Sequence, residues 1–134
     1  MPSIATASWS RSTLRPDPTD VARGPRAEAL AAEYLVREGL TIVARNFRTR
    51  FGEIDLIAKE GGTLVFVEVR LRSSPGFGGA LESITAQKRG RMIAAARGYL
   101  ATIGGDPPCR FDAVLMQRLD AACIDWRRDI VDVE

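Results

Sequence analysis

The sequence predicts a single α/β domain with elements in the order αβββαββ, and its hydrophobic patterning carries this prediction. Two segments, 25–39 and 84–103, repeat apolar residues at the three- and four-residue spacing of a helix buried on one side. Five shorter segments are rich in β-branched residues, which is typical of strands. The 134 residues of the chain are enough for one domain with one hydrophobic core.

The first helix and three strands are expected in the first half of the chain. Pro25 suits the first turn of a helix, where its missing N–H is no loss, and Gly39 suits a helix end. Strands are predicted at 40–47, 53–59 and 63–71. The Gly61-Gly62 pair is typical of a hairpin turn, so the second and third strands should be neighbours.

The second half is expected to hold the second helix and two further strands. Residues 73–79, which are rich in glycine, are predicted to form a flexible loop before the helix. The Gly-Gly-Asp-Pro-Pro run at 104–108 should end that helix. Strands are then predicted at 110–117 and 121–126.

The N-terminal residues 1–24 are rich in proline, serine and threonine and are predicted to be a disordered tail, which assigns the domain to 25–134. No apolar run approaches the roughly 20 residues of a membrane span. Cys109 and Cys123 suggest neither a disulfide framework nor a four-cysteine metal site. We therefore expect no membrane association and a cytoplasmic protein.

Composition narrows the possible functions. The chain contains no histidine, which excludes Ser-His-Asp and Cys-His hydrolases, histidine-ligated zinc sites and nucleases with a histidine base. The net charge is +2, and residues 119–134 hold five acidic against two basic residues. A mildly basic body with an acidic C-terminal end permits nucleic-acid binding without requiring it.

Two acidic residues interrupt segments that otherwise read as buried strands. Asp55 lies within Ile-Asp-Leu-Ile, and Glu68 lies within Val-Phe-Val-Glu-Val. Burying an ionised carboxylate is unfavourable unless it is paired or binds a metal ion. Side chains alternate along a strand, so Glu68 and Arg70 share a face. If the two strands pair in matching register, Asp55, Glu68 and Arg70 converge on one spot.

Such a cluster has two interpretations. Neighbouring carboxylates repel each other, and Mg²⁺ or Mn²⁺, which prefer oxygen ligands, would relieve that repulsion. An ion held there could polarise a phosphodiester, and Arg70 could hold a phosphate oxygen. Alternatively, Asp55, Glu68 and Arg70 form a purely structural ion-pair cluster on a solvated sheet face.

Several segments together resemble the YraN family of small bacterial proteins, over about residues 24–127. The most specific combination is Gly-Glu-Ile-Asp-Leu-Ile-Ala at 52–58 followed by Phe-Val-Glu-Val-Arg at 66–70. The other matching segments are Ala27-Glu28, Tyr34-Leu35, Gly39, Arg45-Asn46-Phe47-Arg48, Ile84, Lys88 and Arg110-Phe111-Asp112.

That family is similar to restriction-endonuclease-like nucleases, and within these to archaeal Holliday junction resolvases. The resemblance implies a restriction-endonuclease-like fold, with a central mixed β-sheet flanked by helices. It also implies Asp55 and Glu68 as ligands of Mg²⁺ or Mn²⁺, Glu28 as an additional acid on the first helix, and Arg70 at the lysine position of a D…E-x-K site. Resolvase similarity further implies a homodimer, because a junction offers two symmetric strands to cut. The strands within 108–126 are candidates for its surface.

Arg70 departs from the nuclease pattern. An arginine stays protonated in proteins and cannot act as a general base, although it can bind phosphate through two hydrogen bonds. Lys88, on the second helix, is the other candidate for a base. A lysine on a solvated helix face is the alternative interpretation of that residue.

Two groups of basic residues are candidates for contact with nucleic acid. The first group is Arg45, Arg48 and Arg50, with Phe47 and Phe51 interleaved, and the second is Lys88 and Arg91. Cations can follow the phosphate backbone while aromatic rings stack on bases. A solvated strand edge and a charged outer helix face explain the same residues equally well.

The sequence therefore predicts a nucleic-acid-binding protein that acts as a Mg²⁺-dependent endonuclease on DNA, with branched or junction DNA as the candidate substrate and RNA as the alternative. Two other functions remain open. One is a nucleic-acid-binding module of the same fold that does not cut, which Arg70 favours. The other is a scaffold protein for which nucleic acid is irrelevant, and salt-sensitive retention on DNA would argue against it.

Overall fold

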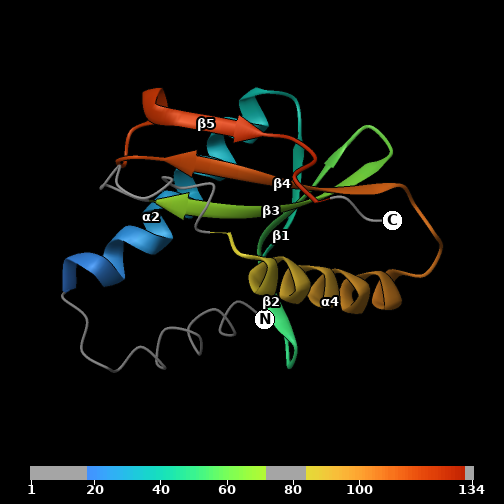
Figure 1. The fold of residues 1–134 in the computed structure, drawn as a ribbon. Coiled ribbons are helices and arrows are strands. Elements are labelled where there is room, and N and C mark those ends of the chain that lie inside the picture. Colours follow the sequence, from blue (N-terminus) through green and yellow to red (C-terminus); the bar gives the residue numbers. More distant parts are fainter. Residues whose placement is uncertain (1–17, 72–83, 132–134) are drawn as a thin grey trace.

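A computed structural model describes residues 18–71 and 84–131 as a five-stranded mixed sheet with a helix on each face (Figure 1). The elements are α2 (Pro18–Arg37), β1 (Thr41–Thr49), β2 (Gly52–Glu60), β3 (Thr63–Leu71), α4 (Ala86–Ile103), β4 (Cys109–Met116), the short 3₁₀ helix η2 (Ala121–Cys123) and β5 (Ile124–Arg127). The predicted α/β class and the order αβββαββ are confirmed, with η2 as an addition. No helix in the described part of the chain is long and apolar enough to cross a membrane.

The strands lie in the sheet in the order in which they occur along the chain. β1, β2 and β3 form an antiparallel meander, and Gly61 with φ +61° makes the turn between the last two. β3 and β4 are parallel, and α4 lies between them in the chain. A parallel pair needs such a crossover connection, and a helix is its usual form. β4 and β5 are again antiparallel.

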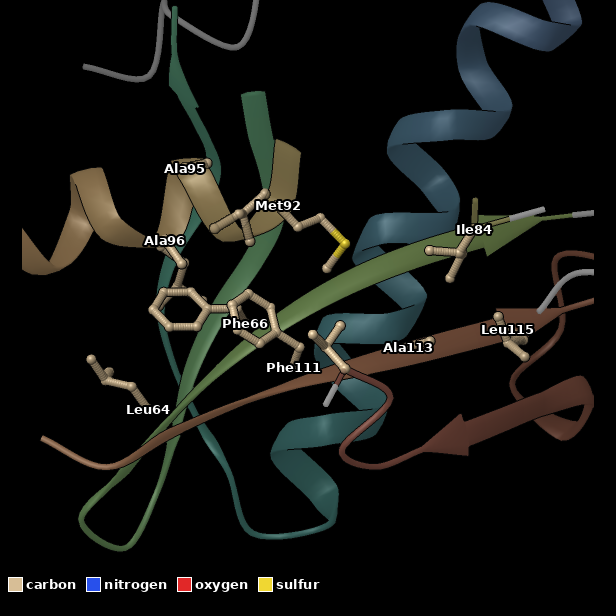
Figure 2. Close-up of a cluster of buried hydrophobic side chains, with 12 residues drawn as sticks. Leu64, Phe66, Ile84, Met92, Ala95, Ala96, Phe111, Ala113 and Leu115 are labelled. Carbon is tan, nitrogen blue, oxygen red and sulfur yellow. The ribbon is translucent and has the colours of Figure 1, made fainter. Parts of the chain in front are cut away.

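The first core lies between α4 and one face of the sheet (Figure 2). Met92, Ala95 and Ala96 on α4 pack against the aromatic rings of Phe66 on β3 and Phe111 on β4. The two rings lie 5.3 Å apart between their centroids. Thr85 begins α4, because its hydroxyl accepts a hydrogen bond from the N–H of Lys88, which is the usual capping arrangement. This core fixes α4 over the centre of the sheet.

The second core lies between α2 and the opposite face. Four residues of α2 are buried there, Ala27, Ala31, Ala32 and Leu35. They pack against alternate strand residues such as Val65 and Val67 on β3. Because β3 is covered on both faces, its sequence is a nearly continuous apolar run.

The predicted start of the first helix at Pro25 is wrong. α2 begins at Pro18, and Pro25 lies inside it. Proline has no N–H, so the helix continues through this point without one of its backbone hydrogen bonds. The predicted end is confirmed: the N–H of Leu40 bonds the carbonyl of Leu35, and Gly39 has φ +104°. Most of the predicted disordered tail and the loop at 73–79 lie outside the described residues.

The last predicted strand also begins later than expected, at Ile124 instead of Ala121. The side chain of Asp120 accepts a hydrogen bond from the N–H of Ala122 and so caps η2. An aspartate at this position stabilises a helical turn in preference to an extended strand.

The turn between β1 and β2 packs directly against the backbone of α4. A Cβ atom placed on Gly52 would lie 2.8 Å from the carbonyl carbon of Arg91 and closer still to its oxygen. We expect Gly52→Ala to lower the free energy of unfolding by about 1–3 kcal/mol, because backbone has to move. Gly62→Ala is the matched control, since a Cβ there meets no atom within 4 Å. Urea unfolding measures the stability of both variants. Equal stabilities would show that the approach of Gly52 to Arg91 leaves room for a side chain.

Candidate functional site

Regular alternation of side chains breaks down at Asp55 in β2. Ile54 and Ile57 both pack into the α4 core, although a regular strand would place them on opposite faces. On the neighbouring strand, Asn46 has φ +53°, and the β1–β2 pairing steps over both Asn46 and Asp55. This paired irregularity releases Asp55 from the sheet ladder.

The carboxylate of Asp55 accepts a hydrogen bond from the backbone of β3 at the point where the pairing of β2 with β3 ends. The last register pair between these strands is Leu56 with Val67. Just beyond it, Oδ2 of Asp55 accepts a hydrogen bond from the N–H of Val69 at 2.8 Å. An aspartate interrupts the apolar strand here because its side chain supplies an acceptor to the adjacent β3 backbone.

Carboxyl groups from three elements meet at this point. Asp55 is hydrogen-bonded to Glu28, which reaches it from α2, and to Glu68 on β3. Glu28 is also hydrogen-bonded to the side chain of Asn46. Glu68 is buried, with 7% of its surface exposed. Asp55 therefore interacts with both of the other sequence-predicted acids, Glu28 and Glu68.

Burial raises the pKa of all three carboxyl groups, and charge repulsion adds to the effect at Glu28 and Asp55. Burial, together with the charge of Asp55, raises the pKa of Glu28 to about 8, while the hydrogen bond from Asn46 opposes the change. Burial and the charge of Glu68 raise the pKa of Asp55 well above its ordinary value. Burial also raises the pKa of Glu68, against the lowering effect of the nearby positive charges of Arg70 and Lys88. The cluster therefore retains protons at neutral pH in the absence of a cation.

These shifts predict that the protein without divalent cations is more stable in mild acid than in mild base. The folded state binds protons at Glu28 more tightly than the unfolded state does, so this contribution is fully present below pH 4.5 and is lost as the pH rises to about 8. Urea unfolding in EDTA across this range tests the prediction. We expect Glu28→Gln to flatten the profile, whereas Glu33→Gln, at an exposed position on the same helix, should leave it unchanged. A flat wild-type profile would contradict the prediction.

Two cations stand next to the acidic group. A guanidinium nitrogen of Arg70 lies 3.2 Å from a carboxylate oxygen of Glu68. Lys88 approaches the same carboxylate from α4, since its charge acts on Glu68. The convergence of Asp55, Glu68 and Arg70 that matching registers would produce is thus present, and Lys88 joins it from the facing helix.

A cleft of about 400 Å³ opens between the β1–β2 turn and α4, and Glu68 forms part of its wall. Its other lining residues are Arg48, Thr49, Arg50, Phe51, Gly52, Glu53, Lys88, Arg91 and Met92. Four of these residues are cationic. Arg48 is paired with Glu53 at 2.7 Å. Arg45 is separate from this group, since it lines another pocket with Glu33 and Arg37 of α2.

The donor set suits a hard divalent cation of the magnesium type. Within 18–71 and 84–131, no group of three or more Asp, Glu or Cys side chains is already arranged to hold a metal ion. Magnesium needs fewer protein ligands than that, because it keeps several waters and is often held by one or two carboxylates together with a substrate phosphate. Asp55 and Glu68 form such a pair, and Glu68 lines the wall of a cationic cleft.

Comparison with known proteins places this arrangement in a family. Residues 27–116 match the model of the uncharacterised protein family UPF0102. The chain belongs to UPF0102. A UPF0102 protein of Methylobacillus flagellatus is 54% identical over 79% of this chain and 93% of its own length. A UPF0102 protein of Nitrosomonas europaea is 54% identical over 82% of this chain and 93% of its own length. One from Cupriavidus taiwanensis is 49% identical over 88% of each chain.

The UPF0102 match spans the whole acidic group and also a second buried acid, Asp112. Asp112 is fully buried on β4, and its carboxylate accepts hydrogen bonds from Arg110, the indole N–H of Trp126 and the backbone N–H of Asp129. Every partner of Asp112 is a donor within the protein. The Arg-Phe-Asp segment that the family resemblance includes therefore has a structural explanation in this chain.

The sequence analysis gave Asn46 no role, and it did not distinguish Phe51 from Phe47. Asparagine is disfavoured within strands and tolerates positive φ, so an asparagine inside a predicted strand could have signalled the irregularity opposite Asp55. Phe47 and Phe51 were equivalent in the pattern. Phe47 packs in the core against Tyr99, whereas Phe51 is exposed at the cleft.

Proposed function

We propose that this UPF0102 protein is a Mg²⁺-dependent endonuclease that acts on DNA. The observation that supports the proposal is the interaction of the half-buried carboxyl group of Asp55 with that of Glu68, which is buried at the wall of a cleft lined by four cations. A buried acidic pair is unfavourable by itself. A divalent cation would neutralise the two carboxylates, and a phosphodiester would pair with the cations of the cleft.

Each residue of the site has a distinct task under this proposal. Asp55 and Glu68 would hold the ion, and Glu28, in contact with Asp55, would fix the position of that carboxylate. The ion would supply Lewis-acid polarisation of the phosphodiester and lower the pKa of an attacking water. Arg70, which is paired with Glu68, would hold that carboxylate in place and fix the scissile phosphate. Lys88, which lines the same cleft as Glu68, would neutralise developing charge.

The cations of the cleft would bind the DNA backbone. Arg48, Arg50, Lys88 and Arg91 lie on two walls, the β1–β2 turn and α4, so that a strand in the cleft meets positive charge on both sides. Contacts of this kind release counterions and weaken as salt increases. A substrate with two equivalent strands, such as a four-way junction, would be cut by a homodimer, which we propose as the active form.

The test is cleavage of labelled four-way-junction, flap, single-stranded and duplex DNA by the full chain, with Mg²⁺, with Mn²⁺ and with EDTA. We expect cuts that require the ion. Catalytic variants are needed to exclude a contaminating nuclease, and Asp55→Asn and Glu68→Gln serve here because each changes one carboxylate to an amide of the same shape. No cleavage from folded protein on any of these DNAs would overturn the proposal.

A second candidate function is a DNA-binding module that does not cut, and the position of Arg70 favours it. Arg70 occupies the place at which a nuclease of this type carries a lysine, and it is paired with Glu68. Its guanidinium cannot serve as a base. Under this alternative, the protein binds junctions in gel shifts without cleavage, and Arg70→Lys, which restores the nuclease pattern, leaves it inactive.

A further inference from the structure

We propose that Phe51 stacks on an unpaired base of the bound strand, so that the protein selects DNA with unstacked bases over continuous duplex. This inference rests on the proposed binding of DNA in the cleft and names the substrate class. Phe51 is 66% exposed and lines the same cleft as Glu68. Bases in a continuous duplex are stacked on their neighbours and offer no free face, whereas those of single strands, flaps and junctions do.

Phe51 is the exposed apolar side chain that stands out among the described residues. The others with large exposed apolar surface are the aliphatic Val36, Val43 and Ile103, and their exposed fractions lie between 40% and 53%. An aromatic ring held in water is unfavourable unless it gains a partner on binding. Of these four side chains, Phe51 is the one with a flat π face, and it is the one that lines the cationic cleft.

The turn that carries Phe51 is held in one conformation by Thr49. The hydroxyl oxygen of Thr49 accepts hydrogen bonds from the N–H groups of Phe51 at 3.0 Å and of Gly52 at 3.1 Å. The same hydroxyl donates to the carbonyl of Gly52 at 3.1 Å. All of its hydrogen-bonding capacity is therefore used within the turn. A ring presented on such a turn loses little conformational freedom on binding, which favours affinity.

The turn is also anchored against α4, on the other side of the cleft. Gly52 approaches the carbonyl of Arg91 so closely that no side chain would fit between them. The positions of Phe51 and of the α4 cations are thus coupled. A strand whose phosphates contact Lys88 and Arg91 would lie in the same cleft as the ring.

Charge next to the ring fits a nucleotide better than an apolar peptide. The guanidinium of Arg50 lies 5.4 Å from the centre of the Phe51 ring, and both residues line the cleft. A nucleotide presents a flat base and an anionic phosphate, which match an aromatic ring and an adjacent cation. Base–aromatic stacking tolerates any sequence, because every base has a π face. The proposed selectivity is accordingly for unpaired structure and is independent of sequence.

The experiment measures binding in EDTA, where cleavage does not interfere, by fluorescence anisotropy with three labelled DNAs. These are a single strand, its continuous duplex and the same duplex with an internal bubble. We expect Phe51→Ala to weaken binding of the single strand and the bubble by about 5- to 150-fold, the range seen when one stacking residue is removed. Binding of the duplex should change less than about twofold, because its affinity comes from phosphate contacts.

Matched variants separate stacking from other effects. Phe51→Trp should keep or strengthen the preference for unpaired DNA, and Phe51→Leu should lose it, since leucine retains apolar surface without a π face. Ile103→Ala removes an exposed apolar side chain about 22 Å along α4 from Lys88, at 1.5 Å per residue, and should leave all three affinities unchanged. With 2-aminopurine in the bubble, fluorescence should change on binding to the wild type and not on binding to Phe51→Ala.

The outcomes of this experiment are distinct from those of the cleavage assay. An equal loss on all three DNAs, or no loss on any, would overturn the stacking role of Phe51. A loss confined to unpaired DNA together with no cleavage in Mg²⁺ would uphold the stacking role and reject the endonuclease. An absence of DNA binding by the wild type would reject both.

Discussion

Replacing Asp112 with alanine is expected to lower the free energy of unfolding by about 3–5 kcal/mol, the range for removing one partner of a buried ion pair. Asp112 is fully buried and contacts Arg110 at 3.0 Å. Its loss would also leave the indole N–H of Trp126 and the backbone N–H of Asp129 without their acceptor. An amide does not repair this, because Asp112→Asn places an NH₂ group against N–H donors. Both variants should therefore unfold at lower urea concentration.

Asp125 provides the matched control. It forms the same arrangement with an arginine two residues away, Arg127, at 2.9 Å, but both side chains are about half exposed. Exposed pairs of this kind contribute about 0–1 kcal/mol. We expect Asp125→Ala to be nearly neutral. If Asp112→Ala and Asp125→Ala lowered stability by the same amount, the buried network around β4 would have no special role in the fold.

Much of the fold could be predicted because each element has a strong local signal. β3 is apolar on both faces and is followed by a helix and another strand, which is the pattern of a sheet covered on two sides. The glycine pair that begins at Gly61 was enough to predict that β2 and β3 are neighbours joined by a turn. Element boundaries were less predictable. Pro25 is compatible both with a first turn and with the interior of a helix, and the sequence does not distinguish the two.

The candidate site could be predicted in its composition but not in its construction. Strict alternation along β2 and β3 was sufficient to bring Asp55 near Glu68. It did not reveal that β1 and β2 are both irregular there. It also did not reveal that Asp55 would form hydrogen bonds to the backbone of β3 and to Glu28 on α2. Such contacts depend on how three elements pack together. Local sequence patterns carry no information on that packing.

Asp55→Asn is expected to reduce cleavage to the level seen in EDTA while raising the stability of the cation-free protein. The amide oxygen can still accept the hydrogen bond from Val69, so the local fold is retained. Replacing the carboxylate removes the charge repulsion that contributes to the raised pKa of Glu28 and to that of Asp55 itself. We expect the free energy of unfolding to increase in EDTA at neutral pH, because the variant no longer places an ionisable carboxyl group where the charged form is unfavourable.

Magnesium should reverse the order of stability of the two proteins. The wild type gains about 2.7 kcal/mol at a hundred times its dissociation constant, whereas the variant lacks a ligand and gains little. Glu33→Gln is the control, since Glu33 lies at an exposed position on α2. It should follow the wild type in both conditions. Thermal unfolding with Mg²⁺ and with EDTA measures these differences without reference to cleavage. If wild type and Asp55→Asn responded identically to Mg²⁺, the ion would not bind at Asp55, and the acidic group would be a structural cluster that shares protons.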